Sequence, residues 1–163
     1  MKVLFVCLGN ICRSPLAEAL FIHHLKEQGL SQIFRADSCG TSSLHQGDLA
    51  DKRTRANASE HGIEITHRSR PFVVEDFEIF DLIVVMDESN YTNIEKLSLS
   101  SEHLEKVVFL RDFDLELSEE DDIDVPDPWF GGDEGFEEVY QMIDRCILEL
   151  INTLKPEENE INS

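Results

Sequence analysis

The sequence predicts an α/β fold in three layers, with a parallel sheet covered by helices on both faces. Short apolar runs alternate with longer polar stretches along the chain, which is typical of strands joined by crossover helices. The run Leu82–Val85 is apolar at every position, as expected for a strand buried on both faces of a sheet. The chain has 163 residues, of which 41% are hydrophobic, and this suits one domain with a sizeable core.

Each element is placed by its hydrophobic pattern and by the residues that end it. Strands are expected at residues 2–7, 33–38, 81–86 and 106–110, where apolar and β-branched residues cluster. Helices are expected at 15–28, 51–61, 88–97 and 133–154, and glycines 29 and 62 stand where the first two should end. The last helix has an apolar stripe formed by Phe136, Val139, Ile143, Cys146 or Ile147, Leu150 and Leu154. Residues 1–156 should form a single domain, followed by a flexible tail at 157–163.

The net charge and the cysteine content indicate which binding partners and which cellular compartment to expect. The formal net charge is −20, from 34 acidic and 14 basic residues, which disfavours nucleic acid and anionic membranes as partners. No apolar run is long enough for a signal peptide or a membrane span, so a soluble, cytoplasmic protein is expected. The four cysteines should then be reduced thiols. No paired Cys-x-x-Cys motif or histidine cluster in the sequence predicts a metal site.

An acidic run precedes the segment Asp127-Pro128-Trp129. Its acids are Asp114, Glu116, Glu119, Glu120, Asp121, Asp122 and Asp124. The simpler interpretation is a solvated, mobile loop, which is the usual state of such a run. The alternative is that these crowded carboxylates raise the pKa of Asp127 and disfavour acidic peptides.

The segment Cys7-Leu8-Gly9-Asn10-Ile11-Cys12-Arg13-Ser14 carries the clearest chemistry. It lies between the first apolar run and Pro15, at a junction between an expected strand and an expected helix. Backbone N–H groups at the start of a helix converge on anions, and the helix dipole favours both a phosphate and a thiolate there. The planar guanidinium of Arg13 can bind two phosphate oxygens at once. The spacing alone would also fit a buried cysteine and an unrelated surface arginine.

Three other residues of the segment favour a phosphate-binding loop. Gly9 allows the backbone to turn closely around a ligand. Asn10 tolerates left-handed geometry and can hold a loop with side-chain hydrogen bonds. The Ser14 hydroxyl can donate to a thiolate. The segment therefore predicts a nucleophilic cysteine beside a bound phosphate.

This segment resembles the signature loop of the low-molecular-weight protein tyrosine phosphatases. The resemblance continues in the family's order at residues 37–42, 61–63 with His67 and Arg70, 86–90 and 127–129, so it covers nearly the whole chain. It implies a four-stranded sheet in the order 2-1-3-4, and hydrolysis of phosphotyrosine and small aryl phosphates without a metal or organic cofactor. The implied partners are phosphotyrosine-containing proteins as substrates and inorganic phosphate as product. We expect a monomer or weak self-association.

The resemblance also implies catalytic roles for single residues. Cys7 matches the nucleophile that forms a phosphocysteine, and Arg13 matches the phosphate clamp. Asp127 matches the general acid, which then acts as the base that activates water. Cys12 matches a backup thiol that forms a reversible disulfide with Cys7 under oxidants. Cys39 and Cys146 are expected to be packing residues instead.

A supporting network is implied around the loop. Ser38 and His67 match residues that shape the loop by hydrogen bonds together with Asn10 and Ser14, and Asp87 matches a carboxylate that orients the arginine. Glu18 and Asp37, the suggested neighbours of His67, should favour its charged form.

Leu8, Ile11 and Trp129 are expected to line a slot for an aryl phosphate. Leu44 departs from the family, because many relatives have Trp or Tyr there, and Phe130 replaces a common tyrosine beside Trp129. One alternative is a phosphoarginine phosphatase, although such relatives carry Thr at the position of Ile11. Another is an arsenate reductase, which needs further cysteines after the third strand, and residues 80–98 contain none.

Overall fold

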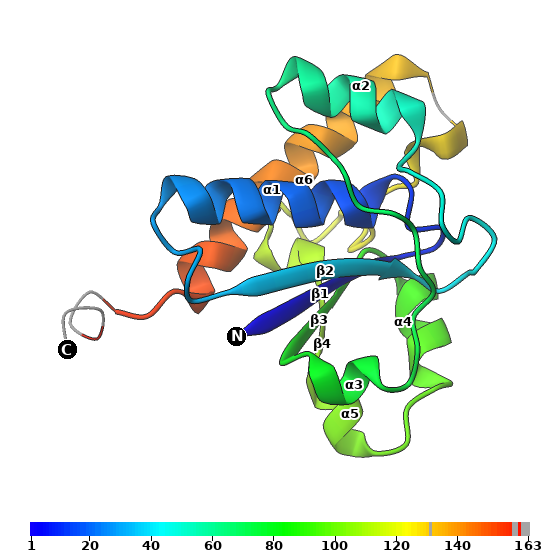
Figure 1. Cartoon of the computed structure of the whole chain (residues 1–163), viewed down its shortest axis with the longest axis vertical. Coiled ribbons are helices and arrows are strands. Elements are labelled where there is room, and N and C mark those ends of the chain that lie inside the picture. The colour runs from blue at the N-terminus through cyan, green and yellow to red at the C-terminus, as the bar shows by residue number, and fades with distance from the viewer. Residues whose placement is uncertain (131, 158–159, 161–163) are drawn as a thin grey trace.

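A parallel sheet in the order β2-β1-β3-β4 lies at the centre of the computed structural model, which describes residues 1–130, 132–157 and 160 (Figure 1). Its strands are β1 (Lys2–Cys7), β2 (Arg35–Gly40), β3 (Leu82–Val85) and β4 (Val107–Phe109). The order agrees with the one that the family resemblance implied. β1 is central and pairs in parallel with both β2 and β3. Cys7, its last residue, therefore lies at the carboxyl edge of the sheet, where ligands of such folds bind.

Helices cover both faces of the sheet (Figure 1). On one face lie α1 (Arg13–Glu27) and α6 (Asp133–Leu154), with α2 (Lys52–Glu60) packed against α6. On the other lie α3 (Asp76–Ile79), α4 (Glu88–Glu95) and α5 (Ser101–Glu105). Two short 3₁₀ helices span Leu110–Phe113 and Pro128–Phe130. None of the described helices has the length and apolar content needed to cross a membrane.

Alternate residues of β1 divide the core into two parts, as the period of a strand requires. Val3 and Phe5 face α1 and α6, and Phe5 meets Phe21 of α1 edge-on with ring centroids 5.5 Å apart. Leu4 and Val6 face the opposite layer, where aromatic side chains of α3 and its flanks pack. The strand that carries Cys7 is therefore buried on both sides and holds that residue in a fixed place.

Some element bounds differ from the sequence prediction for local reasons. β2 begins at Arg35 rather than at residue 33, because the Ile33 N–H donates to the Leu30 carbonyl in a turn after α1. The helices α3 and α5 were not predicted, because one turn is too short to display a helical period. The predicted tail at 157–163 lies mostly outside the described residues.

Candidate active site

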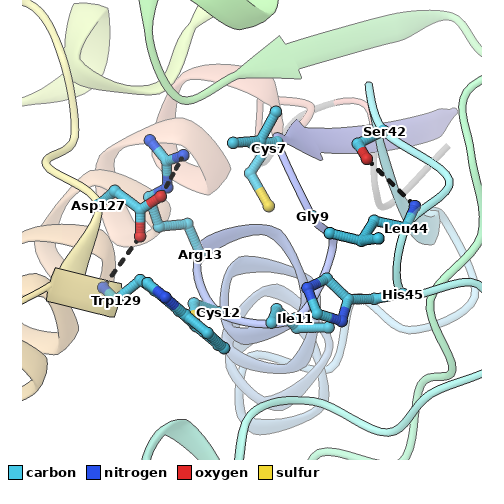
Figure 2. Close-up of a pocket in the computed structure, with 11 residues that line it drawn as sticks. Cys7, Gly9, Ile11, Cys12, Arg13, Ser42, Leu44, His45, Asp127 and Trp129 are labelled. Carbon is cyan, nitrogen blue, oxygen red and sulfur yellow. Dashed lines mark hydrogen bonds and ion pairs between the residues drawn. The ribbon is translucent and has the colours of Figure 1, made fainter.

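A cavity of about 330 Å³ opens at the carboxyl end of β1, and the Cys7 sulfur points into it (Figure 2). The cavity is lined by Cys7, Leu8, Gly9, Ile11, Cys12, Arg13, Ser42, Leu44, His45, Asp127 and Trp129. The predicted loop thus meets the predicted acid, although more than one hundred residues separate Cys7 from Asp127 in the sequence. Sequence reasoning had assigned no role to Ser42 or His45.

The backbone of the loop is bent at Asn10. This residue has a φ of 55°, and it is the one residue other than glycine with positive φ among those the structure describes. Its conformation is left-handed, which asparagine tolerates better than most residues. Gly40, at the end of β2, allows the loop to approach, because a Cβ there would lie 2.6 Å from the Leu8 carbonyl oxygen.

A buried network of short polar side chains connects the loop to the sulfur. Asn10 Nδ2 donates to Ser14 Oγ at 2.8 Å and to Ser38 Oγ at 3.0 Å. Because Ser14 Oγ accepts from Asn10, its own proton is available to Cys7 Sγ, which lies 3.0 Å away. The Cys39 carbonyl, 3.3 Å from the same hydroxyl, is the competing acceptor. The Ser14 hydroxyl is therefore placed to donate to the Cys7 sulfur.

His67 closes this network from the outer side. Asn10 Oδ1 is an acceptor, so His67 Nε2, at 2.8 Å, must donate to it. The other ring nitrogen, Nδ1, then faces Glu18 at 3.3 Å and Asp37 at 3.4 Å. Burial and the nearby Arg70 nevertheless lower the pKa of His67, against the attraction of Asp37. Asp37 thus favours the charged form, as predicted, but burial outweighs it and the net direction of the pKa is downward.

Glu18 is the acid of this cluster whose pKa burial changes most. Burial raises the pKa of Glu18 from 4.5 to about 7, and the charge of Asp37 adds to the rise. The folded protein therefore binds more protons than the unfolded chain between these two values. By linkage, the free energy of unfolding falls as the pH rises through that window.

Replacing Glu18 by glutamine is expected to flatten this pH dependence. The neutral amide carries no charge to bury, so Glu18→Gln should be more stable than the wild type at about pH 8, by up to about 3 kcal/mol. At about pH 5 the two proteins should differ much less. Urea unfolding at both pH values measures the effect, with the exposed Glu64→Gln as control. Equal pH slopes for Glu18→Gln and wild type would contradict the assignment.

Arg13 is held by two fixed acceptors behind the cavity. Its Nη1 donates to Asp87 Oδ2 at 2.7 Å and to the Val125 carbonyl at 2.9 Å. Asp87 is itself fixed as the N-cap of α4, where it accepts from the Asn90 N–H. Burial opposes the charge of Arg13, but Cys7 and Asp87 raise its pKa, and the net direction is upward. Arg13 is therefore a permanent cation in the cavity that Cys7 also lines.

Asp127 lies above the loop at the mouth of the cavity (Figure 2). Its Oδ1 accepts from the Trp129 N–H at 3.0 Å, which fixes the carboxyl group in a local turn. Its Oδ2 lies 3.6 Å from Arg13 Nη2. About 33% of the side chain is exposed, so a leaving group or a water molecule can reach it.

The other three cysteines are buried thiols. Burial raises the pKa of Cys12 and of Cys146 to about 12, and it raises that of Cys39 well above its usual value. All four cysteines are unpaired in the structure. Cys12 lines the same cavity as Cys7, whereas Cys39 and Cys146 belong to the hydrophobic core, as predicted.

The acidic run is not a uniformly solvated loop. Asp114 is buried and binds both Arg111, at 3.1 Å, and Arg145 of α6, at 2.9 Å. Burial opposes its charge, but these contacts lower the pKa of Asp114. At the other end, Asp124 Oδ1 accepts from the Glu88 N–H, and burial raises its pKa. The run therefore begins on an anchored ion-pair network, which a charge count could not reveal; its effect on Asp127 stays a prediction.

Of two predicted wall residues, the structure describes the side chain of Leu44 but not that of Phe130. Leu44 lines the cavity mouth but is 81% exposed, as its position at a loop tip dictates. Phe130 belongs to the 3₁₀ turn at Pro128–Phe130, and its side chain lies outside the described part of the structure. His45 also lines the cavity, and its ring centroid lies 6.0 Å from that of Trp129 (Figure 2). The one signal in the sequence that could have identified His45 as a lining residue is its place directly after Leu44.

Among the residues that the structure describes, two groups of side chains bring possible metal ligands together. One is Glu18, Asp37 and His67, and the other is His23, His24 and Glu27; within each, the ligand atoms lie within 4.8 Å of one another. In the first group, His67 donates to Asn10 and Asp37 accepts from Arg70. In the second, His24 binds Asp144 at 2.6 Å. Both groups lie outside the cavity lining.

Comparison with known proteins identifies one family. The family model described as "Low molecular weight phosphotyrosine protein phosphatase" matches residues 2–160. A low molecular weight protein-tyrosine-phosphatase of Streptomyces coelicolor is 38% identical, over 94% of this chain and 93% of its own. The crystal structure of a protein tyrosine phosphatase from Entamoeba histolytica is 38% identical, with a TM-score of 0.87 over 98% of this chain and 99% of its own.

A second solved structure bears on specificity. The arginine phosphatase of Drosophila is 32% identical and superposes with a TM-score of 0.87, covering 97% of this chain and 100% of its own. Proteins named for two phosphoryl acceptors thus share this fold, so the substrate has to be argued from the cavity. The match of the family model over nearly the whole length shows that this chain belongs to the low molecular weight phosphotyrosine protein phosphatase family.

Proposed function

We propose that this protein hydrolyses phosphotyrosine in proteins, and small aryl phosphates, through a covalent phosphocysteine. The observation that carries the proposal is the meeting of the Cys7 sulfur, the Arg13 guanidinium and the Asp127 carboxyl group in one cavity. A nucleophile, a fixed cation and a proton donor are the groups that cleavage of a phosphate ester needs.

The first step transfers the phosphoryl group to sulfur. The Cys7 thiolate attacks phosphorus in line, so that an S–P bond forms while the bond from phosphorus to the phenolic oxygen breaks. Asp127 gives its proton to the departing oxygen, and tyrosine leaves as a neutral phenol. Arg13 and the loop N–H groups bind the equatorial oxygens as negative charge spreads over them.

The second step releases inorganic phosphate. Deprotonated Asp127 takes a proton from water, and the resulting nucleophile attacks phosphorus opposite the sulfur. The S–P bond breaks, and its electron pair returns to Cys7 as a thiolate. The Ser14 hydroxyl, 3.0 Å from the sulfur, stabilises this leaving group.

The cavity walls favour an aryl ester over the alternatives. Leu8, Ile11 and Trp129 present apolar surface around the phosphate position, which suits a phenyl ring. Ile11 offers no hydrogen-bonding group to a guanidinium, so phosphoarginine is the less favoured substrate. Arsenate reduction is disfavoured because residues 80–98 supply no cysteine for a disulfide relay.

The proposal extends to the setting of the enzyme. A cytoplasmic location is supported by the four unpaired cysteines, since reduced thiols are typical of that compartment. Cys12, in the same cavity as Cys7, is proposed as the thiol that protects the nucleophile by a reversible disulfide. We further propose a single domain at 1–156 that acts as a monomer or with weak self-association.

Turnover of matched phosphopeptides tests the substrate class. A peptide carrying phosphotyrosine should be hydrolysed far faster than the same peptide carrying phosphoserine or phosphoarginine. The short phosphoserine side chain leaves the apolar walls unfilled, and phosphoarginine brings a charged guanidinium between them. Faster release of phosphate from the phosphoarginine peptide would overturn the proposed substrate.

The substitution Asp127→Asn is expected to remove general acid catalysis while keeping Cys7 and Arg13 in place. Loss of general acid catalysis should lower kcat/KM for phenyl phosphate by about 10²- to 10⁴-fold. 2,4-Dinitrophenyl phosphate should be affected much less, because its leaving group departs without a proton. Glu64→Gln, an exposed change outside the acidic run, serves as the control. An equal loss on both substrates would contradict the role given to Asp127.

A further inference from the structure

We propose that Arg53, at the start of α2, is a positioning residue that holds the Asp127 segment over the phosphate loop. This inference rests on the proposed function, because it assigns to Arg53 an effect on the proton transfer from Asp127. Arg53 does not line the catalytic cavity, and its action goes through the residues that it binds.

Arg53 binds the segment that carries Asp127 both by a hydrogen bond and by contacts of its planar guanidinium with aromatic rings. Its Nη1 donates to the Trp129 carbonyl at 3.3 Å. Its guanidinium carbon lies 5.2 Å from the centre of the Trp129 ring and 4.6 Å from that of the Phe136 ring. A guanidinium beside two aromatic rings is attracted to both of their faces. Trp129 is therefore held through its backbone and its ring at once.

The guanidinium of Arg53 is also linked to the phosphate loop, through Asp51. Its Nε donates to Asp51 Oδ1 at 3.2 Å, and its Nη2 donates to Asp51 Oδ2 at 3.3 Å. Asp51 is the N-cap of α2, and its own N–H donates to the Ile11 carbonyl at 2.7 Å. Phe136 packs with Ile11 and Cys12 in a small buried cluster. Two of the partners of Arg53, Asp51 and Phe136, thus contact the loop that carries the nucleophile.

These contacts form one connected path from the loop to the acid. It runs from the Ile11 carbonyl through Asp51 and Arg53 to Trp129, and the Trp129 N–H holds Asp127 Oδ1 at 3.0 Å. The acid segment is a single 3₁₀ turn, which has little rigidity of its own. The direct tie between Asp127 and Arg13 is longer, at 3.6 Å. Arg53 therefore supplies much of what fixes Asp127 relative to the sulfur.

The simpler interpretation is an ordinary surface arginine. Its side chain is 40% exposed, which fits that interpretation as well. The two interpretations differ in what a substitution changes. An arginine that only adds positive charge near the cavity should affect all substrates alike, whereas a positioning residue should affect the step that needs a well-placed proton.

The leaving group of the substrate separates these cases. In Arg53→Gln, kcat/KM for phenyl phosphate should fall by about tenfold or more, a part of the general-acid contribution. For 2,4-dinitrophenyl phosphate it should change by less than about twofold, since no proton is needed. Arg53→Lys keeps the charge without the planar fork and should give an intermediate loss on phenyl phosphate. Lys52→Gln, which removes the charge of an exposed neighbour, should match the wild type on both substrates.

The outcomes distinguish the positioning role of Arg53 from the alternatives. Equal losses on both substrates, or no loss on either, would overturn the positioning role. Thermal unfolding shows whether Arg53→Gln is folded; if it is not, the same two-substrate comparison on Arg53→Lys decides between the cases. Failure of the wild-type enzyme to turn over either ester would count against the proposed function itself, and not against Arg53 alone.

Discussion

Replacing Cys7 by serine is expected to abolish turnover while leaving the phosphate site intact. A serine hydroxyl at this position is a far weaker nucleophile than a thiolate, so no phosphoenzyme should form. Removal of a covalent nucleophile costs about 10⁶-fold in kcat in a well-studied hydrolase, and a loss of this order is expected here. The rest of the phosphate site should keep its geometry, because Arg13 is held by Asp87 and by the Val125 carbonyl rather than by the sulfur.

Phosphate affinity should remain equal or rise in the Cys7→Ser protein. The neutral hydroxyl does not repel a phosphate dianion as a thiolate does. Calorimetric titration with inorganic phosphate measures the affinity, and release of phosphate from an aryl ester measures turnover. Cys146→Ser, in the core and outside the cavity, is the matched control, and thermal unfolding verifies its fold. Turnover that survives in Cys7→Ser would remove the covalent mechanism.

Replacing Arg13 by lysine is expected to give the second largest loss. One Nη of Arg13 is engaged by Asp87 and by the Val125 carbonyl, which leaves the remaining edge of the fork for phosphate oxygens. A lysine ammonium is a single point charge, so it cannot hold both the protein partners and the phosphate in this geometry. An arginine that stabilises a phosphoryl transition state contributes about 10³- to 10⁵-fold, and a fall in kcat/KM of about 10³-fold is expected.

The charge of the site is kept in Arg13→Lys, so the loss isolates the geometry of the guanidinium. Steady-state kinetics on an aryl phosphate gives kcat/KM, and thermal unfolding shows whether Asp87 remains satisfied. Arg35→Lys, an exposed change at the start of β2, controls for the substitution itself. A loss of less than about tenfold would show that a point charge suffices and that the fork is not needed.

Local sequence patterns predicted the central features of this site well. The left-handed Asn10 and the Ser14 contact to Cys7 follow from residue types within one short loop. The apolar run of β3 and the stripe of α6 were also readable, because burial on a strand or a helix imposes a period on the sequence. The family resemblance added the strand order and the role of Asp127, which periodicity alone does not give.

Features that depend on distant contacts were missed. Asp37 favours the charged form of His67 as predicted, but the burial that lowers its pKa was not foreseen. The acidic run begins on a buried Asp114 whose partner Arg145 lies on the last helix. The contacts of Arg53 with Trp129 and Phe136 join segments that are far apart in the chain. No local pattern in the sequence carries such pairings.

The sequence by itself determined the nucleophilic loop, because a strand, a cysteine, a bendable asparagine and the start of a helix are all set by neighbouring residues. Only the tertiary structure decided how that loop becomes a catalytic site. It brings Asp127 to the cavity mouth, Asp87 behind Arg13 and His67 against Asn10. The physical reason is that covalent neighbours fix backbone geometry, whereas burial and long-range contacts fix which proton and which charge each side chain carries.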